Sequence, residues 1–144
     1  MINNNLKYAR EDLEMTQEEL GLVFGVKSST VAGWENNHDT IPLNKLIKYS
    51  NNFGYSLDYL TGLSRTNKKH DKIDKLNKIT IGKTLKEIRL KLNLSQQEIA
   101  DECMIHQTTY SGYEKGSYLI SSLVLYTICK NHNLSMDAIL MRKK

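Results

Sequence analysis

The chain has 144 residues, of which 40% are hydrophobic, with 20 Lys and Arg against 16 Asp and Glu. This length allows one medium domain or two small ones, and the apolar content with a net charge of only +4 excludes extended disorder. The sequence has neither a long apolar run nor an apolar signal segment, so we expect a cytoplasmic protein with no membrane partner. One proline and eight glycines leave few helix breaks, which predicts an all-α fold.

The sequence contains two copies of one pattern at an offset of 79 residues. Residues 16–26, TQEELGLVFGV, align with residues 95–105, SQQEIADECMI. Without a gap, about 14 of 56 aligned positions are identical, several times the number expected by chance. The repeat predicts two tandem domains, over 1–64 and 82–144, joined by a linker over 65–81.

Each copy is expected to form five short helices. In the first copy the apolar spacing and the helix start and stop signals place them at 5–15, 16–24, 27–37, 42–53 and just after Ser56. In both copies the second helix begins with a capping-box pattern, Thr16 to Glu19 and Ser95 to Glu98. The second helix, a short turn and the third helix then make a helix-turn-helix.

The turn inside this helix-turn-helix differs between the copies. Gly25 ends the second helix of the first copy and can take the left-handed backbone conformation that closes a helix. Met104 stands at the same place in the second copy. We therefore expect the second turn to be strained or to differ in shape.

These residues resemble the XRE/Cro-type, lambda-repressor-like family of helix-turn-helix DNA-binding domains. The resemblance is carried by residues 16–36 with 56–64, and by residues 95–116 with 135–141. It implies two tandem five-helix domains in a sequence-specific regulator of transcription that binds double-stranded DNA, and we expect a repressor. The alternative is a protein-interaction module, antitoxin-like or an anti-repressor partner, in which the first domain dimerises or binds a partner instead of DNA.

Helix three of each domain is expected to lie in the major groove, where its outward side chains would contact bases. In the first copy the outward positions are Lys27, Ser28, Ser29, Ala32 and Gly33. In the second copy they are His106, Gln107, Thr108, Ser111 and Gly112. The Gln107 amide can pair with an adenine edge and the Thr108 methyl suits a thymine methyl, so the second copy is expected to read the sequence.

The two glycines depart from the family, which often carries a long polar side chain at this position. Either Gly33 and Gly112 let helix three approach DNA closely, or base reading there has been lost.

Four further residues are candidates for contacts with phosphates. Gln17 and Gln96 begin the second helices, where free backbone N–H groups favour an anion, although each glutamine could instead only cap the turn. Asn36 and Lys115, just after helix three, are either phosphate ligands or simply solvated.

The resemblance also implies an internal ion pair in each domain, between helix one and the end of helix three. The residues are Arg10 with Glu35 and Arg89 with Glu114. Contact of each arginine with a phosphate is the alternative. A buried pair of this kind adds little net stability, but the loss of one partner is costly.

Charge separates the domains from the linker. Residues 1–64 carry a net charge of −3, residues 65–80 carry +4 and residues 81–144 carry +3. The second copy and the linker are therefore expected to supply most of the attraction to phosphates. Ile73, Leu76 and Ile79 are spaced by three and favour a short helix in the second half of the linker.

The same linker bears on how the chain assembles. Fully extended, it would reach across the roughly 34 Å between half-sites, so one chain could act as a pseudo-dimer, as an alternative to a homodimer. The linker charges could equally serve solubility alone.

Other chemistry is sparse. The four histidines and the cysteines Cys103 and Cys129 have no metal-ligand spacing, so no metal is expected, and the thiols are expected to be reduced. No catalytic constellation or cofactor motif occurs, so we expect neither an enzyme nor a cofactor. A protein effector remains open.

Overall fold

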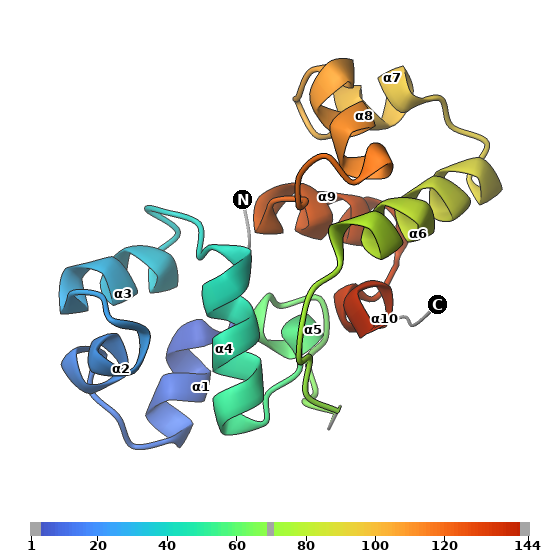
Figure 1. Ribbon diagram of the computed structural model, residues 1–144. Helices are drawn as coiled ribbons and strands as arrows, with labels where there is room; N and C mark the ends of the chain where they lie inside the picture. The colour runs from blue at the N-terminus through green and yellow to red at the C-terminus, as the bar shows by residue number, and fades with distance from the viewer. Residues whose placement is uncertain (1–3, 69–70, 142–144) are drawn as a thin grey trace. The chain divides into compact units, whose positions relative to one another are not determined.

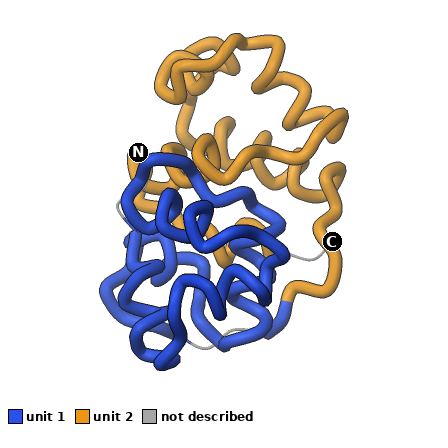
Figure 2. The backbone as a smooth tube through the Cα atoms, turned by 90° about the vertical axis from the view of Figure 1, so that its left-hand side faces the viewer, with its two compact units in different colours: residues 1–72 blue, residues 73–144 orange. Residues whose placement is uncertain are grey.

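The computed structural model describes residues 4–68 and 71–141, which form ten helices and no strand (Figure 1). The chain divides into two compact units, Met1–Lys72 and Ile73–Lys144, called unit 1 and unit 2 below (Figure 2). The prediction of an all-α fold with two five-helix domains is confirmed. Among the described helices, none combines the length and the apolar character needed to cross a membrane.

Unit 1 is built from five helices around a small aromatic core. The helices are α1 (Leu6–Asp12), α2 (Gln17–Phe24), α3 (Ser28–Glu35), α4 (Leu43–Phe53) and α5 (Leu57–Leu60). Each helix buries at least one aliphatic side chain, and Phe24 packs its ring on Trp34 and Tyr49 with centroid distances of 5.8 and 5.5 Å. Burial of these rings together with the aliphatic side chains stabilises the domain.

Unit 2 repeats the same order of helices. They are α6 (Lys78–Lys91), α7 (Gln96–Glu102), α8 (Gln107–Lys115), α9 (Ser122–His132) and α10 (Met136–Met141). Its core has fewer aromatic contacts, because Phe24 and Tyr49 correspond in sequence to Cys103 and Ile128. Leu125 and Ile128 of α9 are completely buried.

Capping boxes start the second helix of both units. The Thr16 hydroxyl accepts a hydrogen bond from the Glu19 backbone N–H at 3.0 Å, and the Glu19 carboxylate accepts one from the Thr16 N–H at 2.9 Å. Ser95 and Glu98 make the same two bonds at 3.0 and 2.9 Å. These bonds satisfy backbone donors that a helix start leaves free, so they fix where α2 and α7 begin.

Helix α6 is longer than its counterpart α1. It begins at Lys78, seven residues before Leu85, which corresponds to the first residue of α1. The Asn77 side chain caps it by accepting from the N–H groups of the next helical residues at 3.0 and 3.1 Å. At Gly82 a Cβ atom would lie 2.5 Å from the carbonyl oxygens of Tyr113 and Glu114, so the added turns pack tightly on the end of α8.

The linker forms less helix than its sequence spacing predicts. Residues 71–77 have no regular structure, and helix begins only at Lys78. At the other end, Asn67 accepts a hydrogen bond from the Ser56 N–H at 2.7 Å and donates one to the Gly54 carbonyl at 3.1 Å. The first linker residues thus fold onto unit 1.

The turns of the two helix-turn-helix segments have the same shape despite their different residues. Gly25 has φ 69° and Met104 has φ 58°, both in the left-handed region. Of the two outcomes expected for the second turn, strain is the one observed, because a side chain at positive φ crowds its own backbone. The Met104 side chain is 93% exposed, so no packing contact compensates for this conformation.

Candidate nucleic-acid interface

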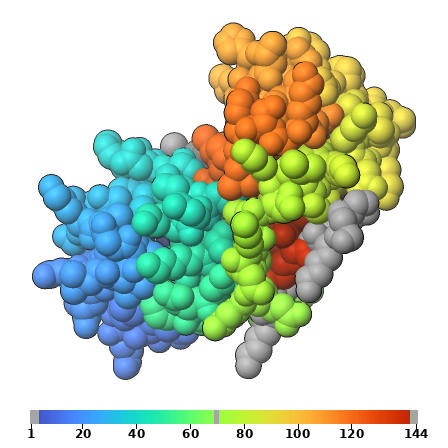
Figure 3. Space-filling view, in the orientation of Figure 1, coloured from blue at the N-terminus to red at the C-terminus, as the bar shows by residue number. Residues whose placement is uncertain are grey.

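Each unit holds its second and third helices in a fixed relation. An equivalent backbone hydrogen bond closes the turn in each unit. The Val26 N–H donates to the Gly21 carbonyl at 2.9 Å, and the Ile105 N–H donates to the Ala100 carbonyl at 3.1 Å. In the space-filling view the yellow and orange atoms of α7 and α8 form one continuous surface (Figure 3). These bonds hold the third helix of each unit next to the second.

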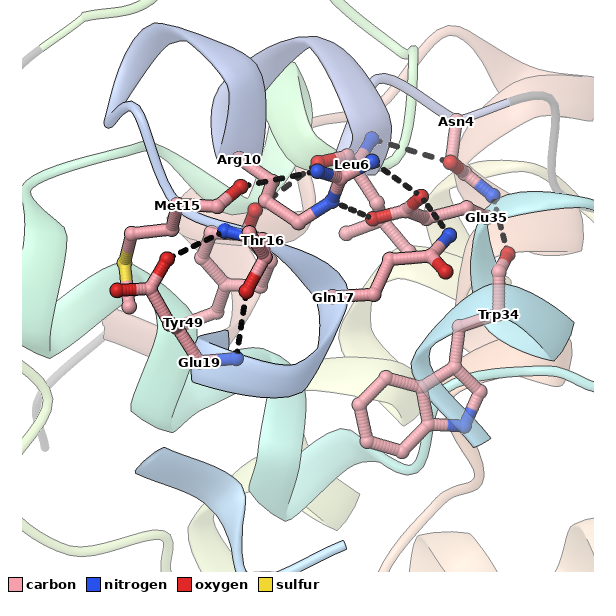
Figure 4. A network of polar contacts seen from close by, with 10 residues as sticks. All are labelled: Asn4, Leu6, Arg10, Met15, Thr16, Gln17, Glu19, Trp34, Glu35 and Tyr49. Atoms are coloured by element: carbon pink, nitrogen blue, oxygen red, sulfur yellow. Dashed lines mark hydrogen bonds and ion pairs between the residues drawn. The ribbon is translucent and has the colours of Figure 1, made fainter. Parts of the chain in front are cut away.

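A bidentate ion pair anchors the end of α3 to α1. Arg10 Nε lies 2.7 Å from Glu35 Oε2, and Arg10 Nη2 lies 3.1 Å from Glu35 Oε1 (Figure 4). Arg10 also donates to the Met15 carbonyl at 2.9 Å, and Gln17 Nε2 donates to Glu35 Oε1 at 3.0 Å. Three of the five N–H donors of the Arg10 guanidinium thus bond within unit 1, so Arg10 has a structural role.

Unit 2 contains the same network. Arg89 Nε and Nη2 lie 2.6 and 3.1 Å from the two Glu114 carboxylate oxygens, and Gln96 Nε2 donates to Glu114 Oε1 at 2.9 Å. The side chains of Arg89 and Glu114 are only 11% and 4% exposed. Burial alone would raise the pKa of Glu114, but the hydrogen bonds, chiefly from Arg89, hold it below its ordinary value.

The side-chain amides of Gln17 and Gln96 point to the ion pairs. Each amide donates one N–H to its glutamate, and its second N–H makes no hydrogen bond within the described residues. In unit 2 the chain of bonds goes one step further, because Gln107 Nε2 donates to Gln96 Oε1 at 2.7 Å. Ser28 corresponds to Gln107 in unit 1 and is exposed. The structure thus brings Gln96, Gln107 and Glu114 together.

Most of the other candidate residues lie on the surface of the third helices. The exposed ones are Lys27, Ser28, Ser29, Asn36, His106, Thr108 and Lys115. Gln107 and Ser111 are half-buried. In α8 the spacing of three and four residues from Thr108 to Ser111 and Lys115 places these side chains on one side of the helix.

Gly33 and Gly112 differ from this pattern because both are buried. The chain folds back over them after the helix, where the His38 N–H donates to the Gly33 carbonyl and the Ser117 N–H donates to the Gly112 carbonyl, both at 2.9 Å. Of the two alternatives expected for these glycines, their burial gives no support to a close approach of DNA, and the loss of base reading there stays a prediction. The close approach that requires glycine here comes from the protein itself.

Two residues that the sequence analysis missed cover these glycines. A Cβ on Gly33 would lie 3.3 Å from Asp39 Oδ2, and a Cβ on Gly112 would lie 2.6 and 2.7 Å from Cζ and the hydroxyl of Tyr118. Asp39 and Tyr118 are at equivalent positions, six residues after the glycine. The presence of glycine at one place in both copies was a signal of close approach, but the sequence did not indicate from which side.

The two surfaces carry different charge. In the first turn of α2, unit 1 has the exposed Glu18 where unit 2 has Gln97. Unit 1 likewise has Asp39 where unit 2 has Tyr118. Near a phosphate backbone each carboxylate is repelled, so the surface of unit 2 is the more favourable for nucleic acid.

Neither surface has metal-site chemistry. Within the part of the chain that the structure describes, no three or more His, Cys, Asp or Glu side chains are grouped as a metal ion would need. Neither Cys103 nor Cys129 is in a disulfide, and burial, with a smaller effect of Glu102, raises the pKa of Cys103 to about 11.

Comparison with known proteins agrees with the architecture. The helix-turn-helix family model matches the chain twice, at residues 6–60 and 85–139. The HTH-type transcriptional regulator ImmR of Bacillus subtilis (strain 168) is 30% identical over 88 residues, which cover 61% of this chain and 68% of that protein. Since the two family matches cover more than half of the chain, the chain belongs to the XRE-type helix-turn-helix family and contains two tandem domains of it.

Proposed function

We propose that the chain is a sequence-specific regulator of transcription that binds double-stranded DNA, with α8 of unit 2 in the major groove. The observation that carries the proposal is the hydrogen bonding of the Gln107 side-chain amide. One of its N–H groups is bonded to Gln96, which leaves the other N–H and the carbonyl oxygen for a partner. One donor beside one acceptor is what the N7 and N6 edge of adenine requires.

Other residues of α8 fit the same role. Thr108 is exposed one residue further along and offers a methyl group to thymine, and Ser111 offers a hydroxyl one turn later. The exposed Lys115 ends the helix and suits a phosphate, as does the remaining N–H of Gln96. His106 is exposed just before α8 and is a candidate for contact with the sugar-phosphate backbone of DNA.

Unit 1 is proposed to contribute less than unit 2 to the recognition of specific bases. Its third helix offers Lys27, Ser28 and Ser29, and Asn36 follows it, so weak polar contacts to DNA remain available. The relative ImmR is named a transcriptional regulator. We infer repression as the mode of action, because a chain that occupies its site blocks other proteins without needing any further surface.

A second candidate function applies to unit 1 alone. Glu18 in the first turn of α2 and Asp39 over Gly33 of α3 place carboxylates on its helix-turn-helix, which disfavours contact with phosphates. This favours a protein partner, or a second copy of the chain, on unit 1. The alternative is that two units on one chain act as a pseudo-dimer on DNA.

Selection from a library of random duplexes tests the main proposal. The full chain should enrich one sequence, and Gln107→Ala should cost about 1 to 3 kcal/mol at one base pair. Ser28→Ala, at the equivalent place in unit 1, is the matched control and should change little. Absence of any enriched sequence, or retention that does not depend on salt, would overturn the proposal.

The stoichiometry of the complex separates the candidate roles of unit 1. One chain per site with a footprint of two half-sites supports a pseudo-dimer, whereas two chains per site support dimerisation. Light scattering of the full chain without DNA then tells whether the dimer exists before binding.

A further inference from the structure

The centre of the outer side of α8 has no side chain of its own. Gly112 lies four residues after Thr108 and one residue after Ser111, in the part of the helix that would face DNA. The ring of Tyr118 lies over it, so close that a Cβ on Gly112 would be 2.6 Å from Tyr118 Cζ. The side chain presented at this point of the helix is therefore that of Tyr118.

The tyrosine ring is held in place. It packs edge-on against Tyr113, with centroids 6.0 Å apart and planes at 88°. The turn that carries it is closed by the Ser117 N–H, which donates to the Gly112 carbonyl at 2.9 Å, and by Gly116 at φ 75°. A residue so fixed loses little further conformational freedom on binding.

Tyr118 nevertheless remains half in solvent, with 50% of its surface exposed. The structure gives its hydroxyl no hydrogen bond within the described residues. A phenolic hydroxyl both donates and accepts, and its ring offers an apolar face, so it can meet any base edge.

Unit 1 shows the same arrangement with opposite chemistry. Asp39 covers Gly33 from the equivalent position, with Oδ2 3.3 Å from where a Cβ would lie. A carboxylate accepts but cannot donate, and it is repelled by phosphates. The residue six positions after the glycine thus determines what each third helix presents.

We propose that Tyr118 is a specificity-determining residue of unit 2, whose hydroxyl hydrogen-bonds a base edge in the major groove and replaces the side chain that Gly112 lacks. This rests on the proposed binding of DNA by α8. It adds a contact from outside the helix-turn-helix to those expected from Gln107 and Thr108.

The test is selection from random duplexes with the full chain and its Tyr118→Phe variant. Phenylalanine keeps the ring on Gly112 and Tyr113 and removes only the hydroxyl. Preference should fall about five- to tenfold at one base pair that Gln107→Ala leaves unchanged, as expected for the loss of one hydrogen bond. Tyr8→Phe, at an exposed tyrosine of α1, is the matched control and should leave every position unchanged.

A second variant tests the position of the side chain and not only its hydroxyl. Tyr118→Ala combined with Gly112→Gln restores a long polar side chain on the helix itself and should change which base is preferred there. Thermal unfolding of each variant checks that unit 2 remains folded. If the double variant does not fold, Tyr118→Phe alone decides.

Two results would overturn the inference while the proposed function stands. One is an unchanged preference for Tyr118→Phe at every base pair. The other is a uniform loss of affinity across all sequences with a smaller salt dependence, which would place the hydroxyl on a phosphate. If the unmodified chain enriches no sequence, the proposed function itself fails, and this inference falls with it.

Discussion

Gln107 Nε2 donates a hydrogen bond to Gln96 Oε1 at 2.7 Å, and so ties the first residue of α8 to the first residue of α7. Gln96 donates in turn to Glu114 Oε1 at 2.9 Å. A side chain proposed to read a base is thus connected, through one amide, to a nearly buried ion pair. The rotamer of Gln107 is set by the fold before any ligand arrives, which reduces the entropy lost on binding.

Removal of the connecting amide should therefore weaken DNA binding. We expect Gln96→Ala to lower affinity about five- to tenfold, because the Gln107 side chain is no longer held in place. Gln97→Ala, at the exposed neighbouring residue, is the control and should have a smaller effect. Titration of a labelled duplex with each variant measures this.

The coupling of the two glutamines can be tested with the double variant. Gln96→Ala and Gln107→Ala should be less than additive, because the second change removes a side chain that the first has already released. Strictly additive losses would contradict a positioning role for Gln96.

Loss of the ion pair in unit 2 should be costly for stability. Glu114→Gln leaves the Arg89 guanidinium without its carboxylate while both side chains stay nearly buried. We expect the free energy of unfolding of unit 2 to fall by about 3 kcal/mol. Urea denaturation followed by circular dichroism measures it, with Asp101→Asn at an exposed site of α7 as the control. A loss no larger than that of the control would contradict the role given to the pair.

The same carboxylate should make stability depend on pH. Because its folded pKa lies below its ordinary value of 4.5, the Glu114 contribution is fully present above about pH 5 and is lost as the pH falls through the folded pKa. We expect the free energy of unfolding to decrease on acidification below pH 4.5. Part of this decrease should be absent in Glu114→Gln, and equal pH dependence in both proteins would refute the prediction.

The left-handed methionine offers a stabilising substitution. Met104→Gly removes the clash of a side chain at positive φ, although it also makes the unfolded chain more flexible, so we expect a net gain of about 0.5 to 1 kcal/mol. Gly25→Ala at the equivalent turn of unit 1 should instead destabilise by about 1 kcal/mol. Thermal unfolding midpoints of the full-length variants report both, and a fall in the midpoint for Met104→Gly would contradict the inferred strain.

Much of the fold follows from the sequence because the repeat compares the chain with itself. Arg10 and Glu35 are identical to Arg89 and Glu114 at an offset of 79, and the structure joins each pair by the same contacts. The capping boxes are local patterns of four residues, so they too are visible without tertiary information.

Contacts made by irregular segments could not be predicted from the repeat or from local patterns. Tyr118 reaches Gly112 from a turn, and no periodicity relates the two residues. The inward direction of the Gln17 and Gln96 amides depends on where Glu35 and Glu114 lie after folding. The added turns of α6 have no counterpart among the residues that the repeat aligns, so the offset carried no signal for them.

Those added turns bear on how the second unit can be produced by itself. A fragment cut at residue 85, where its family match begins, would lack Gly82 and the buried Ile81 and would uncover the carbonyl groups of Tyr113 and Glu114. A fragment that starts at Asn77 keeps the cap of α6 and this packing. The smallest piece of this protein worth expressing is therefore longer than sequence similarity indicates.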